Sequence, residues 1–549
     1  MANALLWLIS LIAAAVGVYL LWGRDDNKVA IVTRRLLIAA SIAATMAMAD
    51  GKTWGAGVWA GYSAIVFVWM LPVLWILQKI RGRGGDGHMR GSNLQNAKTV
   101  ARMIKEKSRF DIGSVPVPVD LETRNFLLAG SPGTGKSQAL TRALDALRAD
   151  DAHAVIADAS GIYLSRYYDS ARDVILCPFD ERAEPWSPLA EIETVADVPA
   201  LTKSLIPDSE GSAREWNGYA QTVLEPLLEH CFTQRKTNAD LFSLACVADL
   251  AELREILAGS PAAPLVAEGN ERMFGSVRAI LGSYLKALQY LHPDAGVDGS
   301  FSIRRHIVEQ QPGWIFLTYQ QQHRDAQKSL IAAQIDIASR AVLSLPPDLN
   351  RRVVFALDEL PLLGKVQSIV DLLTNGRKHG AMIFAGLQTI AQLRDSYGRE
   401  TAQTLLACLG SWLVLRVSDA ETAEYMSKYL GEEEKTRIVQ SGGTSSQGFL
   451  QGSRNEGWQQ QIVKDRIVMP SELQNLPDLV GIFNLAGPVP SAAVSLPLAE
   501  RRPDAAPAFV AAQPRARVIK KPETALTADP PEKTPAAITA ETDTALDLL

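Results

Sequence analysis

The sequence predicts an α/β protein in which a mostly parallel β-sheet is covered by helices and interrupted by an all-α segment. Three observations indicate this fold. Short apolar runs of strand length alternate with helical stretches on both sides of the middle of the chain. Between residues 185 and 303 these strand signals fade and helical spacing dominates. The first eighty residues are crowded with apolar side chains, which is typical of a transmembrane helical anchor.

Composition narrows the class of protein. A chain of 549 residues is too long for one ordinary domain, so two or three domains and a membrane segment are expected. The formal net charge of −5 does not indicate a nucleic-acid partner for the chain as a whole, although a local basic surface stays possible. The four cysteines are scattered without a CxxC pair, which argues against a zinc site or a disulfide framework and suits a reducing cytosol.

The N-terminal segment contains two long uncharged apolar runs, Leu5–Trp22 and Trp54–Leu77. Each is long enough to cross a hydrocarbon core of about 30 Å at about 1.5 Å per residue. A third run, Leu36–Ala49, is of marginal length, so two or three spans are possible, with two favoured. A basic stretch follows Leu77, and the positive-inside rule then places the rest of the chain in the cytosol.

The most specific motif lies between an apolar run and a helical pattern. Asn125–Ala129 suits a buried strand, and Ser137–Arg148 has apolar residues at helical spacing. The residues between them fit G-x-x-x-x-G-K-[ST], a loop whose backbone N–H groups face phosphates at a helix N-terminus. In this motif Lys136 reaches the β- and γ-phosphates of ATP and Ser137 binds Mg²⁺. The predicted nucleotide-binding residues are Gly130, Ser131, Pro132, Gly133, Thr134, Gly135, Lys136 and Ser137.

A second motif supplies carboxylates. Arg352–Glu359 is an apolar strand that ends in two acids. Asp358 at the strand tip can hold Mg²⁺ through water, as a Walker B aspartate does, and Glu359 can orient or deprotonate the attacking water. Acid pairs at strand ends are common, so this motif gains its meaning from the phosphate-binding loop. Together the two motifs predict a RecA-like P-loop ATPase core.

Two more positions are candidates for catalysis. Ala381–Leu387 is another apolar strand, and Gln388 at its tip can sense the γ-phosphate or position water. Arg377 comes just before this strand. It could stabilise transition-state charge in the site of a neighbouring subunit, or it could be an ordinary solvated loop charge.

The remaining elements follow the same patterns. A Gly- and Ser-rich stretch, Ser441–Gly457, predicts a mobile loop, and short apolar runs in Val463–Leu498 should close the sheet. Further strands are expected at His153–Ala157, Asp173–Leu176, Trp314–Thr318 and Trp412–Val417, and helices at Ala220–Cys231, Leu241–Leu257 and Ser276–Leu291. The predicted divisions are the transmembrane anchor over 1–80, the first part of the nucleotide-binding domain over 81–184, an inserted all-α domain over 185–303, the second part of the nucleotide-binding domain over 304–500, and a disordered tail over 501–549.

This layout resembles that of the type IV secretion coupling proteins, the TrwB/TraD-like ATPases of bacterial conjugation. Besides the two nucleotide motifs, the resemblance rests on Pro178–Asp180 followed by Trp186–Pro188, on Thr374–Leu393 and on Ile467–Leu479. It runs from the anchor to about residue 498. The stretch around Gly376–Gln388 is quite specific for the family, whereas the nucleotide motifs are not.

The resemblance implies a multi-pass protein of the bacterial inner membrane, with the bulk of the chain in the cytoplasm. It also implies a homo-hexamer around a channel that binds single-stranded and double-stranded DNA without sequence specificity. Such proteins link the relaxosome, which is a relaxase bound to transfer DNA, to the secretion channel. Gln388 matches the strand-tip glutamine of the family and Arg377 its trans-acting arginine.

The leading hypothesis is therefore an ATPase that drives conjugal transfer of single-stranded DNA. Two alternatives share some of its features. A chromosome-type DNA translocase or another secretion ATPase would use the same nucleotide chemistry. A membrane receptor for relaxase and DNA would use nucleotide only as a conformational switch, although the strand-end glutamate argues for hydrolysis.

Overall fold

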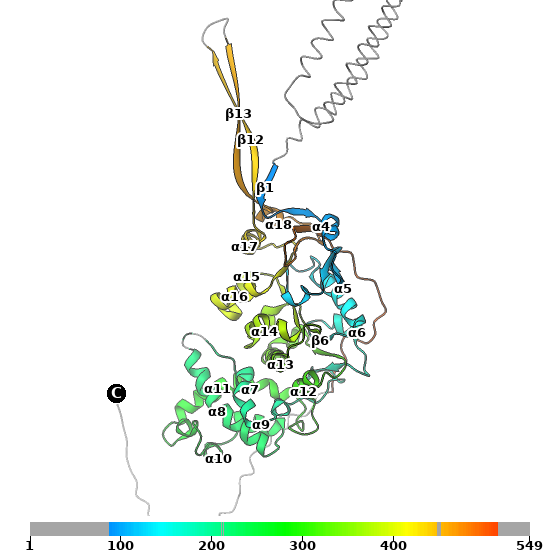
Figure 1. Ribbon diagram of the computed structural model, residues 1–549. Coiled ribbons are helices and arrows are strands. Elements are labelled where there is room, and N and C mark those ends of the chain that lie inside the picture. The colour runs from blue at the N-terminus through cyan, green and yellow to red at the C-terminus, as the bar shows by residue number, and fades with distance from the viewer. Residues whose placement is uncertain (1–86, 210, 212, 447–451, 514–549) are drawn as a thin grey trace, which may run out of the picture. The chain divides into compact units, whose positions relative to one another are not determined.

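The computed structural model describes residues 87–513 apart from 210, 212 and 447–451. The predicted anchor over 1–80 lies outside the described residues. Among the helices that are described, none is both long enough and apolar enough to span a bilayer. The described residues from His88 onward belong to one compact unit, which is shown in Figure 1.

A ten-stranded sheet lies at the centre of this unit. The strand order is β2-β15-β14-β11-β5-β10-β9-β6-β8-β7. Neighbours from β11 to β7 run parallel, and β14 runs antiparallel to the strands on both sides of it. The predicted α/β class is thus confirmed, with a mixed sheet. The strands are β2 (Leu94–Asn96), β5 (Phe126–Ala129), β6 (His153–Asp158), β7 (Val174–Ile175), β8 (Trp314–Thr318), β9 (Val353–Leu357), β10 (Ala381–Leu387), β11 (Ser411–Val414), β14 (Val480–Asn484) and β15 (Ser491–Ser495).

The central strands are buried on both faces because helices cover each side of the sheet. In β5, Leu127 packs into the core on one face, while Phe126 and Leu128 pack into the core on the other. Phe126 stacks on Phe384 of β10 with ring centroids 4.8 Å apart. Helix α13 (Arg324–Ser344) packs on the face that contains Leu127, and α5 (Lys136–Ala149) packs on the face that contains Phe126 and Leu128. Continuous apolar runs, rather than alternating ones, are the sequence signature of such strands.

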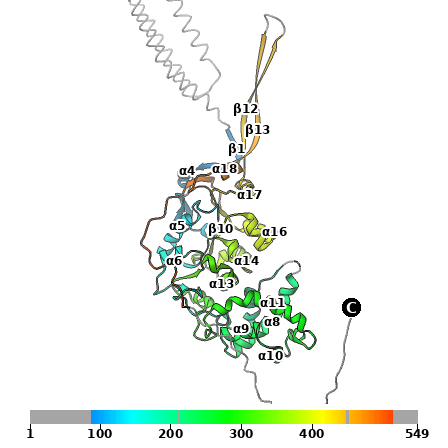
Figure 2. The ribbon, with the colours of Figure 1, turned by 180° about the vertical axis from the view of Figure 1, so that it is seen from behind.

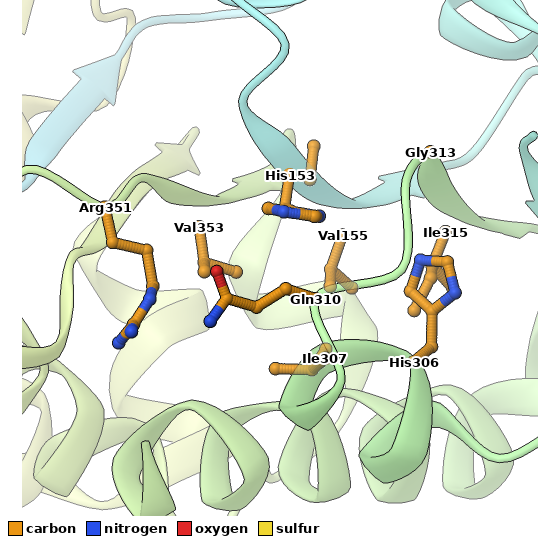
Figure 3. A pocket seen from close by; sticks show the side chains of 10 residues that line it. His153, Val155, His306, Ile307, Gln310, Gly313, Ile315, Arg351 and Val353 are labelled. Carbon is orange, nitrogen blue, oxygen red and sulfur yellow. The ribbon is translucent and has the colours of Figure 1, made fainter. Parts of the chain in front are cut away.

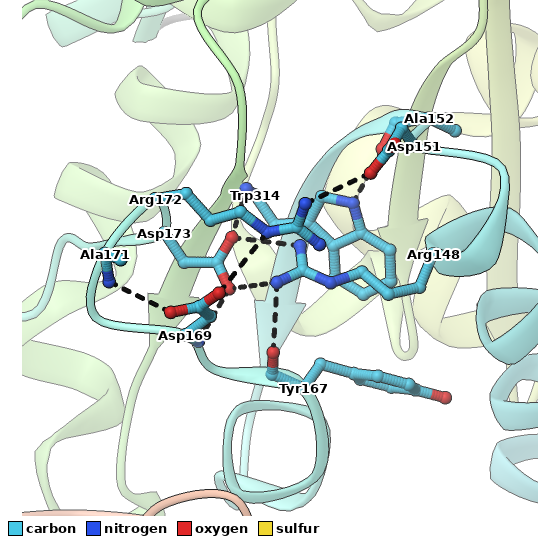
Figure 4. Close-up of polar contacts among 9 residues, drawn as sticks. All are labelled: Arg148, Asp151, Ala152, Tyr167, Asp169, Ala171, Arg172, Asp173 and Trp314. Atoms are coloured by element: carbon cyan, nitrogen blue, oxygen red, sulfur yellow. Dashed lines mark hydrogen bonds and ion pairs between the residues drawn. The ribbon is translucent and has the colours of Figure 1, made fainter.

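The C-terminal end of α5 is fixed by a polar cluster (Figure 4). Arg148 donates two hydrogen bonds to the carboxylate of Asp173, at 2.9 and 2.6 Å, and its guanidinium lies 4.6 Å from the ring centre of Trp314. Asp173 also accepts the backbone N–H of Trp314 at 2.8 Å. The helix that begins at the phosphate-binding loop is therefore held at its far end by β8.

Between β7 and β8 the described residues form helices, which Figure 2 shows gathered together. Buried Glu191 joins the two ends of this segment, since it accepts hydrogen bonds from Trp186 Nε1 at 2.7 Å and from Ser302 Oγ at 2.9 Å. The single helix expected over Leu241–Leu257 is wrong. It divides in two because Asp249 caps a new helix by accepting the N–H of Glu252. The helices here are α7 (Val198–Leu205), α8 (Ala213–Thr233), α9 (Asn238–Cys246), α10 (Leu250–Ile256), α11 (Glu271–Leu285) and α12 (Ile303–Val308).

The loop expected over Ser441–Gly457 is wrong for its described residues. The structure instead forms a long antiparallel hairpin, in which β12 (Glu432–Ser446) pairs with β13 (Gly452–Arg466) along its whole length. Strand β1 (Gly87–Gly91) joins β12 in the same small sheet. Glycine and serine suggested a loop, but a backbone ladder needs only N–H and C=O groups in register.

The disordered tail expected over 501–549 is wrong for its first residues. Residues 500–512, called the C-terminal strap below, are hydrogen-bonded to the core through their backbone. Ala505 N–H donates to Ser165 O at 2.7 Å, and Val510 O accepts the N–H of Glu181 at 2.9 Å. The proline- and alanine-rich sequence has no periodic pattern, so it indicates no helix or strand. The strap is ordered instead by hydrogen bonds to backbone groups of Ser165 and Glu181. Residues 514–549 lie outside the described part of the chain.

Smaller elements complete the unit. Strands β3 and β4 form a separate two-stranded sheet that packs on α5. The remaining elements are α4 (Ala97–Met103), β3 (Ser108–Ile112), β4 (Val115–Pro118), α6 (Ile162–Tyr167), α14 (Ile369–Asn375), α15 (Ile390–Tyr397), α16 (Arg399–Cys408), α17 (Ala420–Leu430) and α18 (Pro470–Gln474).

Candidate nucleotide-binding site

Three motifs that are far apart in the sequence meet at the carboxyl ends of three central strands. Strand β10 lies between β5 and β9, and its register pairs Leu387 with Ala129 and Ala385 with Leu357. The carboxyl ends of these strands are therefore close to level. The phosphate-binding loop follows the first strand, the acid pair the second and Gln388 the third. In open α/β sheets these strand ends are where ligands bind.

The loop after β5 is held by its neighbours on both sides. Gly130 N–H donates to Leu387 O at 3.0 Å, and Ser131 N–H donates to Arg416 O at 2.8 Å. Within the loop, Thr134 Oγ1 donates to Ser131 O at 2.7 Å. These contacts fix the loop between β10 and the end of β11, so that its shape does not depend on its own residues alone.

Two glycines allow the loop to curl into α5. Gly133 and Gly135 have φ angles of +77° and +117°, which side chains disfavour. Gly135 is the N-cap of α5, and a Cβ there would come within 2.8 Å of Leu479. Pro132 is exposed at the tip of the turn. The N-terminus of α5 thus carries the partial positive charge and free N–H groups that bind phosphate.

The loop and the acid pair are in direct contact. Ser137 Oγ donates to Asp358 Oδ2 at 3.3 Å. Lys136 is only 8% exposed, and its ammonium group donates to the loop carbonyls of Gly130 and Ser131. Burial lowers the pKa of Lys136, and the charges of Glu359 and Asp358 oppose that shift. The sequence expectation that these residues share one site agrees with this geometry.

The carboxylates of Asp358 and Glu359 have fewer hydrogen-bond donors around them than buried carboxylates usually have. Burial raises the pKa of both Asp358 and Glu359, and Lys136 opposes the shift in each. Glu359 accepts a 2.7 Å hydrogen bond from Gln388 Nε2. Asp358 Oδ1 and Glu359 Oε1 are buried and accept no hydrogen bond from the described residues. Because buried acceptors are normally satisfied, two orphaned carboxylate oxygens beside Ser137 fit a hard cation such as Mg²⁺ and its water ligands.

If Glu359 is the base of an ATPase, replacing Gln388 with leucine is expected to move the acidic limb of the plot of hydrolysis rate against pH to higher pH. The amide N–H stabilises the ionised carboxylate of Glu359, so its loss raises the pKa of that group further. If the ionised form is the active base, activity then falls at a higher pH than in the wild type. The measurement is kcat against pH, with exposed Gln403→Leu as the control. An unchanged acidic limb would contradict a functional link between the two side chains.

Arg377 is not part of this cluster. It is exposed in the turn Gly376–His379 at the amino end of β10. The seven residues of β10 separate it from Gln388, which at about 3.3 Å per residue is roughly 20 Å. The structure therefore does not bring Arg377 to the site of its own chain.

A small pocket also lies at the amino end of the sheet, as Figure 3 shows. His153, Gln310 and Arg351 face it, together with His306. Burial lowers the pKa of both histidines. The pocket is at the edge of the sheet opposite to the phosphate-binding loop and takes no part in the site described above.

Gly386 in β10 is a site residue that the sequence patterns did not reveal. A Cβ at this position would lie 1.6 Å from the carbonyl oxygen of Asp358. Only glycine permits the close approach of β10 and the strand end that carries the acids. A glycine inside an otherwise apolar strand was the available signal.

Gly386→Ala is expected to lower stability by about 3 kcal/mol and to weaken nucleotide binding, because the backbone around Asp358 must move. Thermal unfolding and nucleotide titration measure the two effects. Gly282→Ala in α11 is the matched control, since an added Cβ there meets no atom within 4 Å. Equal behaviour of the two variants would show that the close contact has no consequence.

The chain can be compared with known proteins at this point. Residues 109–497 match the model of the type IV secretion-system coupling protein DNA-binding domain. The coupling protein TraD of Escherichia coli strain K12 is 31% identical over 474 residues, which are 84% of this chain and 65% of TraD. The chain thus spans a little under two thirds of that relative.

Solved structures of the plasmid coupling protein TrwB are also similar. One is in complex with the non-hydrolysable ATP analogue ADPNP and another with ADP and Mg²⁺. Each is 33% identical, with a TM-score of 0.69, and covers 78% of this chain. The matched regions span 99% and 100% of those two TrwB chains. Together with the family match over most of its length, this shows that the chain belongs to the type IV secretion coupling proteins.

Proposed function

We propose that this protein is an inner-membrane ATPase that couples a relaxosome to a type IV secretion channel and drives conjugal transfer of single-stranded DNA. The observation that carries the proposal is the convergence of Lys136, Ser137, Asp358, Glu359 and Gln388 at one edge of the sheet. Family membership supports the cellular role, because the named relatives are coupling proteins of conjugation and secretion.

ATP and Mg²⁺ are the proposed ligands. Lys136 would contact the phosphates, and Ser137 and Asp358 offer the oxygen atoms that Mg²⁺ prefers. Bound Mg²⁺ supplies neutralisation of the negative charge that develops on the phosphates. Glu359, held by Gln388, would orient the attacking water and accept its proton. The TrwB complexes with ADPNP and with ADP and Mg²⁺ support this choice of ligands.

Arg377 acts on a neighbouring subunit in this proposal. The roughly 20 Å that separate it from its own site leave it free to complete the site of another copy, as an arginine finger does. Its guanidinium is exposed and forms no ion pair with the residues that the structure describes. A ring of six copies around a channel is the assembly that would place it there.

DNA would be held through its phosphates rather than its bases. Binding of this kind is indifferent to sequence and weakens steeply with salt. Single-stranded transfer DNA, double-stranded DNA, the relaxase and the channel components are the proposed partners. Residues 1–80 would anchor the protein as a multi-pass segment, with the remainder in the cytoplasm.

Gene deletion in the native host tests the proposal. We expect plasmid transfer to be lost while growth and chromosome segregation stay normal, and the full-length gene to restore transfer. The purified full chain is expected to hydrolyse ATP faster when single-stranded DNA is added. A segregation defect with normal transfer would instead indicate a chromosome-type translocase. Restored transfer without any hydrolysis would indicate a nucleotide-switched receptor.

A further inference from the structure

Helix α6, which follows β6, lies next to the residues proposed to bind Mg²⁺, Ser137 and Asp358. Asp158 ends this strand, is 1% exposed and accepts hydrogen bonds from four backbone N–H groups. Their donors are Ser160 and Ile162 at 3.2 Å, Tyr163 at 2.8 Å and Leu164 at 2.9 Å. The carboxylate therefore fixes the start of α6 directly above the end of β6.

The position of α6 matters because β6 lies beside β9. Their register pairs Ala157 with Leu357, so Asp158 at the end of β6 and Asp358 just after β9 lie at the same level. Helix α6 then brings Tyr163 to the acid pair. Its side chain is only 2% exposed. A large polar side chain is thus buried against the motif that would hold the metal.

The Tyr163 hydroxyl is buried within range of the charge of Asp358, and it completes no hydrogen bond with the described residues. Asp358 Oδ1 is likewise buried without a partner, while Oδ2 accepts from Ser137 at 3.3 Å. Burial and the charge of Asp358 raise the pKa of Tyr163 well above its usual value.

The outer side of α6 is held by the C-terminal strap. Ser165 O accepts the N–H groups of Ala505 and Ala506 at 2.7 and 3.2 Å. A Cβ on Gly161 would come within 2.4 Å of Ala508 O, so the strap lies directly on the start of the helix. Asp158 and the strap both hold α6 by hydrogen bonds, so the helix keeps Tyr163 at the site.

We propose that Tyr163 is a positioning residue for the magnesium site, whose hydroxyl would donate a hydrogen bond to the carboxylate of Asp358 when Mg²⁺ is bound. This bond would fix the plane of that carboxylate, so that Asp358 and Ser137 present their oxygens to Mg²⁺ in one geometry. The inference rests on the proposed function, because it concerns the metal that accompanies the nucleotide.

Tyr163→Phe tests the proposal, because it removes one hydroxyl and keeps the ring. The measurement is ADP binding by the full-length protein at increasing Mg²⁺ concentration. We expect the variant to need about 10-fold more Mg²⁺ for half-maximal binding, as is common when a group behind a metal ligand is lost. Binding of ADP in the presence of a chelator should stay unchanged. Saturating Mg²⁺ should restore most of the wild-type kcat.

Tyr167→Phe is the matched control on the same helix. The Tyr167 hydroxyl donates to Thr141 O at 2.9 Å and contacts Asp145 at 3.0 Å, away from the site. Its loss should lower the melting temperature and leave the Mg²⁺ requirement unchanged. A wild-type Mg²⁺ requirement in folded Tyr163→Phe would overturn the proposal and leave the proposed function intact. If Mg²⁺ did not change the ADP affinity of the wild type, both the role of Tyr163 and the proposed Mg²⁺ ligand would be overturned.

Discussion

Glu359→Gln is expected to lower the rate of ATP hydrolysis by about 100-fold to 10,000-fold while ATP binding is retained. Glutamine keeps the shape of the side chain and its contact with Gln388 but cannot accept a proton from water. Burial raises the pKa of Glu359, so the ionised form is penalised in the folded protein. The neutral amide removes this penalty, and the melting temperature should be equal or higher.

Glu122→Gln is the matched control for this experiment. Glu122 is fully buried at the other end of β9, where it accepts a 2.6 Å hydrogen bond from Arg352. Removing its charge leaves buried Arg352 without an anionic partner, which should cost about 3 kcal/mol of stability. Hydrolysis per folded molecule should stay normal. If both variants lost hydrolysis equally, Glu359 would have no special role in the reaction.

Lys136→Ala is expected to weaken ATP binding by about 100-fold or more, because each charge-assisted hydrogen bond to phosphate contributes about 1.5–3 kcal/mol. Turnover should fall below detection. The fold should survive, since the ammonium is buried at a cost that already lowers its pKa. Without its positive charge, the pKa values of Asp358 and Glu359 should rise further.

Nucleotide titration, steady-state hydrolysis and thermal unfolding of the full-length protein check these expectations. Lys98→Ala is the control, because Lys98 is exposed on α4 and distant from the loop in the sequence. A further check uses the melting temperature in the presence of ATP. Ligand that binds only the folded state raises this temperature in the wild type. The same rise in Lys136→Ala would contradict a phosphate-binding role.

The sequence predicted the buried strands well because their apolar runs are continuous and bounded by polar residues. The bounds expected for β8 and β10 match the structure. The C-terminal strap was missed because its backbone pairings depend on distant segments. Hairpin β12–β13 was missed because its glycines and serines indicate a loop, although the two strands are neighbours in the sequence. Residue composition therefore does not show whether such a segment is ordered, because its conformation is fixed by backbone hydrogen bonds to other parts of the chain.

The site shows the same division. Lys136 and Asp358 could be predicted from motifs that fix their neighbours along the chain. Tyr163 could not, because its sequence context indicates only a helix with an aromatic core residue. Its closeness to Asp358 follows from the adjacency of β6 and β9, which are far apart in the sequence. Gly386 is similar, because its necessity appears only when the carbonyl of Asp358 is in place.

The order of strands in the sheet also bears on how the chain acquires its structure during synthesis. Strand β5 pairs with residues 384–387 on one side and 411–414 on the other. An emerging chain therefore carries this apolar strand for more than 250 residues before either partner leaves the ribosome. Contacts of such high sequence separation fold slowly and leave sticky intermediates. We expect nascent chains to depend on chaperones until synthesis has passed residue 414.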